Sequence, residues 1–400
     1  MLALLFSATL LELFVGGGGR WITLGPVTLR MLLFVVCIAV GWLAVLFPKR
    51  RYDGLPLAFG LVGAYLVIHL SGLITGATRG TDSPIMLTEL QHSLYWLAAP
   101  FFACTLSSST YIQRTARLVE LAGLLLALAY VTIVICLATG VLKFTVFYAM
   151  LPDNGEVISR GGSLLFYKGD LYLGMALVFL VSLRSRYWLP TALVIAAALI
   201  LTVTRGFILS TSGAILLLLA LQRRKGAFLI GLLLVAIAAT LVWRYLPSLI
   251  EGLSGSRVLS NEQRLSDMDF MWSNTSLKTL LVGEGLGSVI NGRVDIENTM
   301  LWALWKLGLP GLAFWLMPLV LCMTYFAEIP NGRENRLACA FLCGTILVYA
   351  QTLSNPYLNN PIGLSFVIAS VFSLRTIAKG RDSDLLTRSP SAVRSREVVA

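Results

Sequence analysis

The sequence predicts an all-α, polytopic membrane protein, and two observations support that prediction. Of the 400 residues, 57% are hydrophobic and only 13% are charged, whereas soluble domains carry about 25% charged residues. Apolar runs of bilayer-spanning length recur from one end of the chain to the other. Only a helix satisfies its own backbone hydrogen bonds within such a run, so these runs are expected to be transmembrane helices.

About twelve such helices are expected, all within a single membrane domain that covers residues 1–378. Residues 379–400 are rich in Ser and Arg, show no periodicity, and are expected to form a disordered cytoplasmic tail. The opening MLALLFSATLLELFV lacks a basic start and an A-x-A site, so it is expected to be the first span and not a signal peptide. The expected spans are 2–15, 28–47, 55–75, 87–106, 118–140, 168–184, 188–204, 206–222, 226–246, 309–327, 337–354 and 360–377.

The distribution of basic residues predicts the orientation of these helices. The net charge is +11. Most of the basic residues lie in short gaps between expected helices, and two helices separate each such gap from the next. This is the positive-inside pattern, which places the gaps and both termini in the cytoplasm. The charge is therefore attributed to topology, and no nucleic-acid partner is expected. The clusters are Lys49-Arg50-Arg51, Arg114/Arg117, Arg184/Arg186, Arg223-Arg224-Lys225, Arg333/Arg336 and Arg375/Lys379/Arg381.

One arginine, Arg205, interrupts the long apolar run from Tyr187 to Gln222. An arginine at the bilayer centre costs roughly 2.5–3.5 kcal/mol even on the mildest scale. Basic clusters flank both ends of the run, so it is expected to be a hairpin of two spans whose tip, Thr204-Arg205-Gly206, lies at the outer face. Each arm of about 17 residues would be roughly 25 Å long, enough for a minimal crossing.

Two long connections, 141–167 and 247–308, are expected to be periplasmic loops. The second contains helix-compatible stretches at 261–274 and 298–307, with Asn261 as a candidate cap, separated by glycine-rich turns. A loop of this length with its own structure is usually functional.

The outer loops and the hairpin tip carry cations where the positive-inside pattern should deplete them. Planar guanidinium groups suit bidentate contacts with phosphate, and glycine beside them lets a ligand approach the backbone. A phosphate-binding role is therefore one reading of Arg160, Lys168, Arg205, Arg264 and Arg293. For Arg205, Arg264 and Arg160, the alternative is a side chain that only extends to the membrane interface.

The order of four stretches resembles the O-antigen polymerase and ligase family, the bacterial Wzy/WaaL-type membrane glycosyltransferases. The stretches are TRG at the hairpin tip, then NEQRLSDMDFMW, LVGEGLGS and IENTMLWALWKLGLPGL. The resemblance covers about residues 160–327 and extends loosely to the whole chain by helix number. It implies a GT-C-like enzyme of the bacterial inner (plasma) membrane, with its active site on the periplasmic side.

The resemblance also implies a reaction. An acceptor sugar hydroxyl attacks the first anomeric carbon of a glycan on undecaprenyl pyrophosphate, and the lipid diphosphate leaves. Fixed cations stabilise the charge that grows on the leaving phosphate; Arg205 is the first candidate, Arg264 the second and Arg160 the third. Lys168, Gly206 and Arg293 are expected to help bind the substrate. The expected partners are this lipid-linked oligosaccharide and membrane lipids, and a chain-length regulator is left open.

One departure from the family pattern distinguishes polymerase from ligase. In the pattern that ligases of the family resemble, a histidine stands just before the asparagine of the fourth stretch. This chain has Glu297-Asn298 there, and no histidine follows His92. A polymerase is therefore favoured, and a ligase that transfers the glycan to lipid A-core or another acceptor remains the alternative. Glu297 is the candidate general base or orienting group, with Asn298 as a substrate contact; its alternative role is to cap the helix that follows.

Other classes of protein and mechanism stay open at this stage. A metal ion on Asp267 and Asp269 is a weak alternative to the arginines, since aspartates two apart on a helix do not share a face. No cofactor and no metal are expected. A lipid-linked-sugar transporter or flippase would place charges at mid-membrane, and a peptidoglycan polymerase would have a similar architecture. The concentration of charge at the outer rim favours surface chemistry.

Overall fold

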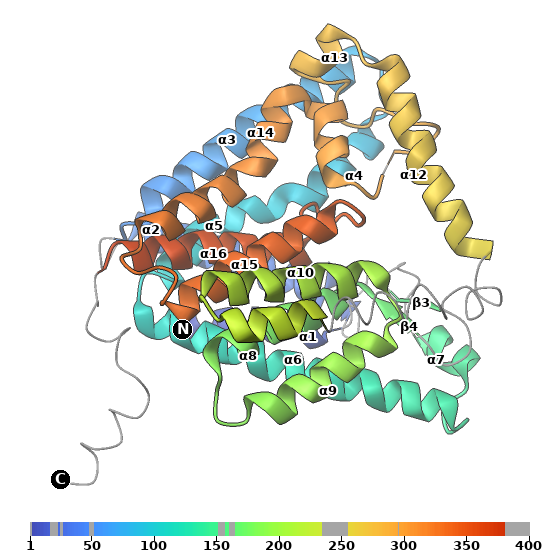
Figure 1. Ribbon diagram of the computed structural model, residues 1–400. Coiled ribbons are helices and arrows are strands. Elements are labelled where there is room, and N and C mark those ends of the chain that lie inside the picture. Colours follow the sequence, from blue (N-terminus) through green and yellow to red (C-terminus); the bar gives the residue numbers. More distant parts are fainter. Residues whose placement is uncertain are drawn as a thin grey trace.

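The computed structural model describes residues 2–16, 23–24, 27–47, 52–150, 157–159, 165–233, 255–294 and 296–380. Helices dominate these residues (Figure 1), which confirms the expected all-α class. The strands form two short antiparallel hairpins. In one, β1 (Thr23–Leu24) pairs with β2 (Val27–Thr28), and in the other β3 (Val157–Ser159) pairs with β4 (Leu165–Tyr167).

The helices follow most of the expected spans, and a further helical segment covers 225–233. In chain order they are α1 (Leu2–Val15), α2 (Leu29–Leu46), α3 (Leu55–Thr78), α4 (Ser83–Ser93), η2 (Leu94–Ala98), α5 (Ala99–Thr105), α6 (Ser109–Ala138), α7 (Phe144–Met150), η3 (Lys168–Asp170), α8 (Leu171–Leu183), α9 (Trp188–Leu201), α10 (Arg205–Leu221), α12 (Gly255–Asn274), α13 (Leu277–Val282), α14 (Thr299–Glu328), α15 (Arg336–Thr352) and α16 (Pro361–Ala378).

Length and composition make this a multi-pass membrane protein. Among the described helices, α2, α3, α6, α14 and α16 are each long and apolar enough to cross a bilayer. Shorter apolar helices accompany them, namely α1, α9, α10, α15 and the segment that joins η2 to α5. The second half of the expected span 226–246, from residue 234, lies outside the described residues, as do 247–254 and the tail from 381.

The expected span 87–106 is wrong as a single helix. The chain instead passes from α4 through the 3-10 helix η2 into α5. The cause is Pro100, which lacks an N–H donor and whose ring clashes with the carbonyl of the preceding turn. A side chain from α2 supports this break, because Trp42 Nε1 donates a hydrogen bond to Leu97 O at 3.2 Å.

Several expected boundaries are also wrong. The helix expected at 118–140 begins at Ser109, so Arg114 and Arg117 lie inside α6 and not in a gap between helices. The loop helix expected from Asn261 begins at Gly255, so Asn261 lies within α12 and does not cap it. The stretches 298–307 and 309–327 form one element, α14, which breaks at Gly308, where φ is 67°.

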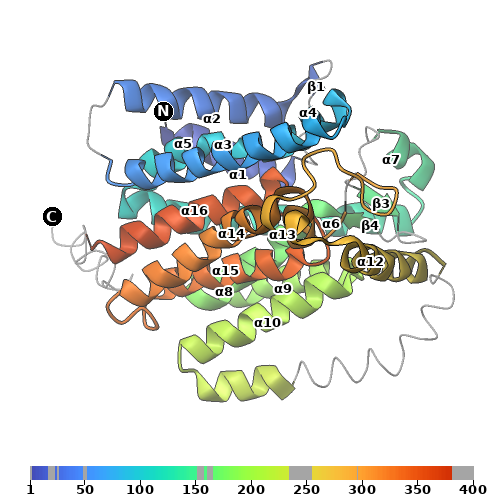
Figure 2. The same cartoon turned by 90° about the horizontal axis from the view of Figure 1, so that it is seen from above.

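The long helices form a bundle whose two ends differ. The N-terminus and the end of α16 lie at one end, and α7, the β3–β4 hairpin, α12 and α13 lie at the other (Figures 1 and 2). Helix α8 is at the centre of the bundle, and its residues are buried without interruption from Leu171 to Leu180. Small residues allow close helix approach there: a Cβ on Gly123 of α6 would lie 2.2 Å from Ala176 Cβ.

Glycines on α3 give this helix one face that accepts another backbone. Leu286 N donates a hydrogen bond to Gly72 O at 2.9 Å. A Cβ on Gly76 would lie 2.3 Å from Leu286 O, closer than any normal contact. Gly60 and Gly63 of the same helix face open space. This difference shows that Gly76 packs against the loop that carries Leu286, whereas Gly60 and Gly63 do not pack in this way.

We predict opposite effects for alanine at these positions of α3. Gly76→Ala should lower the free energy of unfolding by about 1–3 kcal/mol, because the loop backbone has to move away from the new methyl group. Gly60→Ala should be neutral or stabilising by about 0.5–1 kcal/mol, because alanine is the better helix former. Thermal unfolding of both variants in the same detergent tests this, and equal unfolding temperatures would contradict it.

Candidate functional site

The hairpin tip places Arg205 at the first turn of α10. Thr204 precedes the helix, but its hydroxyl donates to Thr202 O at 3.1 Å and does not cap the helix. Arg205 is exposed and makes no hydrogen bond or ion pair with the other described residues. The guanidinium thus adds its charge to the positive end of a helix whose first N–H groups lack a side-chain cap.

The end of α15 lies beside this tip. A Cβ on Gly206 would lie 3.4 Å from Gln351 Oε1 and 3.6 Å from Ser354 Oγ. Gln351 also donates a side-chain hydrogen bond to Ser210 Oγ, which ties α15 to α10. The start of α10 is therefore held against the turn that follows α15.

The segment that leads into α8 is linked to the first turn of α10 through an aromatic contact. The rings of Phe207 and Tyr357 are 6.1 Å apart. Tyr357 donates a hydrogen bond to Lys168 O at 3.1 Å. The backbone of Lys168 is thus linked through Tyr357 to the first turn of α10.

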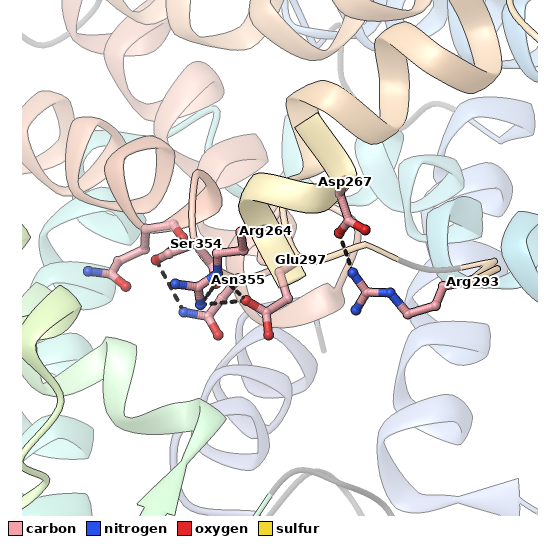
Figure 3. Close-up of polar contacts among 7 residues, drawn as sticks. Arg264, Asp267, Arg293, Glu297, Ser354 and Asn355 are labelled. Carbon is pink, nitrogen blue, oxygen red and sulfur yellow. Dashed lines mark hydrogen bonds and ion pairs between the residues drawn. The ribbon is translucent and has the colours of Figure 1, made fainter. Parts of the chain in front are cut away.

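Arg264 and Glu297 form an ion pair at the same end of the bundle (Figure 3). Arg264 Nε, from α12, donates to Glu297 Oε2 at 2.6 Å. Arg264 Nη2 donates to Ser354 O at 3.2 Å. The two side chains are 39% and 41% exposed, so solvent and ligand have access to the pair. Ser354 is thus a common neighbour of the ion pair and of the hairpin tip.

A second ion pair joins Arg293 to Asp267 (Figure 3). The Asp267 side chain is buried, whereas Asp269 is exposed on another side of α12. The two carboxylates do not converge, as their spacing on a helix predicts. In the part of the chain that the structure describes, no three His, Cys, Asp or Glu side chains come together in a way that could hold a metal ion.

Asn298, and not Glu297, caps α14. Its Oδ1 accepts hydrogen bonds from Met300 N at 3.0 Å and Leu301 N at 3.1 Å, as a helix cap does. Its side-chain oxygen is therefore used within the protein, and the carboxylate of Glu297 is left for the ion pair. Arg160, the third candidate cation, lies outside the described residues.

The glycine-rich stretch LVGEGLGS packs between two helices. Gly283, Gly285 and Gly287 all have positive φ, between 79° and 89°. A Cβ on Gly283 would lie 2.3 Å from Lys306 O, and one on Gly285 would lie 2.3 Å from Gly76 N. Only glycine fits positions that combine this backbone with such close contacts. The stretch serves to seat the loop between α3 and α14.

A buried ion pair that sequence reasoning missed fixes this loop. Lys306 of α14 pairs with Glu89 of α4, and the two side chains are 0% and 1% exposed. Gly287 N donates to Glu89 Oε2 at 2.5 Å. Lys306 Nζ donates to Val294 O at 2.7 Å. The pair therefore holds both ends of 287–294, three residues before Glu297. The available signal was a lysine inside the apolar run MLWALWKLGLPGL, because a buried charge needs a partner.

We predict that this pair controls the order of the loop. Lys306→Met leaves the Glu89 carboxylate buried without its partner and should lower the free energy of unfolding by about 3–5 kcal/mol. The double variant Glu89→Leu/Lys306→Met should recover part of that loss, because no unpaired charge remains. Thermal unfolding and amide hydrogen exchange of 285–294 measure the effect.

The matched control for this prediction is Lys278→Met. Lys278 is an exposed lysine of α13 in the same loop, so its replacement should change the free energy of unfolding by less than about 0.5 kcal/mol. An equally stable Lys306→Met protein with unchanged exchange would show that the buried pair does not hold the loop.

Comparison with known proteins places the fold and the site in context. No protein-family model matches the chain. The chain is 27% identical to the O-antigen polymerase of Shigella flexneri over 386 residues, which cover 92% of this chain and 94% of that protein. The similarity therefore extends well beyond residues 160–327, to nearly the full length of both proteins. It confirms the resemblance that the motifs indicated: over nearly its whole length, this chain is similar to an O-antigen polymerase.

Proposed function

We propose that this protein is an O-antigen or exopolysaccharide polymerase of the bacterial inner membrane. Its donor is a glycan on undecaprenyl pyrophosphate, and its acceptor is a sugar hydroxyl at the periplasmic face. Two observations support this: the similarity to a protein named as an O-antigen polymerase, and the gathering of candidate cations at one end of a membrane bundle.

The observation that carries the proposal is the contrast between Arg205 and its neighbours. Arg264 and Arg293 are each paired with a carboxylate, whereas Arg205 is exposed and has no partner among the described residues. An uncompensated guanidinium at a helix N-terminus is suited to bind a diphosphate. Arg205 is therefore proposed as the main phosphate contact, and Gly206 as the place where the phosphate approaches the backbone.

The proposed reaction is a glycosyl transfer in one step. The acceptor hydroxyl oxygen bonds to the anomeric carbon as the bond from that carbon to the phosphate oxygen breaks. Glu297 takes the hydroxyl proton, and Arg205 stabilises the negative charge that develops on the departing diphosphate. Arg264 holds Glu297 in place while it donates to Ser354 O. Lys168, Arg160 and Arg293 are proposed as further contacts for the donor.

A polymerase is proposed in preference to a ligase because this chain has Glu297 at the position where the ligase pattern of the family has a histidine. A glycan acceptor that grows on its own lipid carrier defines the polymerase reaction, and transfer to lipid A-core defines the ligase reaction. A flippase would move the donor without breaking the glycosidic phosphate bond. The same reconstituted assay separates the three.

We expect Arg205 to be required for chain growth. With purified protein and a defined undecaprenyl-diphosphate oligosaccharide, Arg205→Ala should lower kcat by about 100–1000-fold, as when one donor to a developing anion is removed. Arg205→Lys should remain strongly impaired, because an ammonium cannot reproduce the bidentate contact. Lys278→Ala is the control, and a chelator is expected to have little effect.

The outcomes of that assay are distinct. Full activity of Arg205→Ala would rule out the proposed role of this residue. Full activity of Arg205→Lys would reduce the role to that of a point charge. Loss of wild-type activity with chelator would favour a metal on Asp267 and Asp269.

The proposed orientation predicts which positions react from outside the cell. Trp272 on α12 is 90% exposed, and Trp272→Cys should react with a membrane-impermeant maleimide in intact spheroplasts. Arg333→Cys, in the exposed turn before α15, should react only after permeabilisation. The unaltered chain is the background control, because most of its six cysteines are buried. The reverse labelling pattern would place the proposed site on the cytoplasmic side.

A further inference from the structure

Three segments meet at the end of the bundle away from Arg205, around the last turn of α8. Arg224 Nη1 donates to Val181 O at 3.3 Å. Ser182 Oγ donates to Arg336 O at 2.5 Å and accepts from Gln222 Nε2 at 2.7 Å. The turn after α10 and the start of α15 are thus fixed to α8. These bonds hold the side chain of Arg224 and the backbone of Arg336 at neighbouring residues of that helix.

The cations gathered there have no described counter-charge. Arg184 follows α8 directly, and burial together with the charges of Arg184 and Arg336 lowers the pKa of Arg224. None of these three arginines forms an ion pair with a carboxylate among the residues that the structure describes. Glu120 of α6 interacts instead with Ser185 and Arg117. Like charges held together in this way favour the binding of an anion.

Backbone conformation gives a second, independent observation. Arg184 ends α8 with φ 53° and ψ 57°, and Arg223 has φ 54° in the turn after α10. Helices commonly end with glycine in this left-handed conformation, because other residues pay a steric cost there. At both turns the chain carries arginine where glycine would be less strained. Strain retained in this way points to a role for the side chain.

A cavity of about 330 Å³ is lined by Arg224 and its two chain neighbours, Arg223 and Lys225. Its lining residues come from the end of α10 and the start of the helical segment 225–233. These two helices lie at the edge of the bundle in Figure 2. Phe228 and Leu229 contribute apolar side chains to the lining of the cavity, and Leu229 is 62% exposed. The site therefore combines cations with an apolar channel. Its lining residues are Leu219, Ala220, Arg223, Arg224, Lys225, Phe228 and Leu229.

We propose that this end of the bundle binds the phosphate group of an anionic membrane lipid, with Arg184, Arg224 and Arg336 around the phosphate and an acyl chain along the apolar cavity. Positive-inside topology accounts for basic residues at this end. It does not account for the hydrogen bonds that hold the Arg224 side chain and the Arg336 backbone against α8, for the left-handed conformation of Arg184, or for the cavity beside Arg224. Basic pockets between membrane helices are suited to acidic lipid headgroups.

The test uses the full-length protein in a neutral detergent and measures its unfolding temperature. Added phosphatidylglycerol should raise that temperature by at least about 2 °C, because a ligand that binds only the folded state stabilises it. Phosphatidylcholine at the same concentration should not. The increase should be lost in the triple variant Arg184→Gln/Arg224→Gln/Arg336→Gln and kept in Arg333→Gln, an exposed cation at the same end of the bundle.

Two further measurements distinguish a lipid phosphate from free phosphate and keep the test decisive if the triple variant is unstable. The same increase with inorganic phosphate alone, lost in the triple variant, would support the phosphate site but assign it to a free anion. If the triple variant does not fold, Arg336→Gln alone should raise the half-saturating concentration of phosphatidylglycerol severalfold. An undiminished response in the variants, or an equal response to phosphatidylcholine, would overturn the proposal.

Discussion

The end of the bundle that holds the candidate site depends on the buried ion pair between Glu89 and Lys306. Two charges removed from water are costly unless both find partners, and here each has a second one. Glu89 accepts from Gly287 N, and Lys306 donates to Val294 O. The pair therefore connects α4 and α14 to both ends of one loop. That loop leads directly to Glu297. The position of this candidate base therefore depends on contacts formed up to three residues before it in the chain.

The distribution of charge over this end of the bundle follows from this framework. Arg264 and Arg293 join α12 to the neighbouring loop through Glu297 and Asp267, and these pairs are close to neutral. Arg205 stands apart from them on a separate hairpin. Among the candidate arginines that the structure describes, Arg205 is the one that no described carboxylate offsets, and it lies beside Gly206. In the proposed mechanism, the contacts that build the site are thus separate from the arginine assigned to the leaving group.

Much of the helical framework could be predicted from the sequence, because apolar runs and basic gaps reflect the membrane and not the fold. The tip at Arg205 follows from the same reasoning. The break at Pro100 and the start of α6 at Ser109 were missed, because local breakers and helix ends depend on neighbours. LVGEGLGS was recognised as a recurring stretch, but its packing role becomes visible only when Gly285 lies against Gly76.

The candidate site was predictable only in part, and for a related reason. Arginines in outer loops stand out against the positive-inside pattern, which singles out Arg205, Arg264 and Arg293 from the sequence alone. Ion pairs and hydrogen bonds between segments that are far apart along the chain leave no such signal in the sequence. Neither the partner of Lys306, 217 positions away, nor the place of Ser354 beside Arg264 could be read from spacing along the chain.

The shortness of α9 has a consequence for the surrounding lipid. This helix has 14 residues, which span about 21 Å, whereas the hydrocarbon core of a bilayer is about 30 Å thick. Such hydrophobic mismatch is relieved by tilting or by local thinning of the bilayer. Thinning would draw the headgroup layer inward around this hairpin. A lipid-borne diphosphate would then meet Arg205 without being lifted out of its own leaflet.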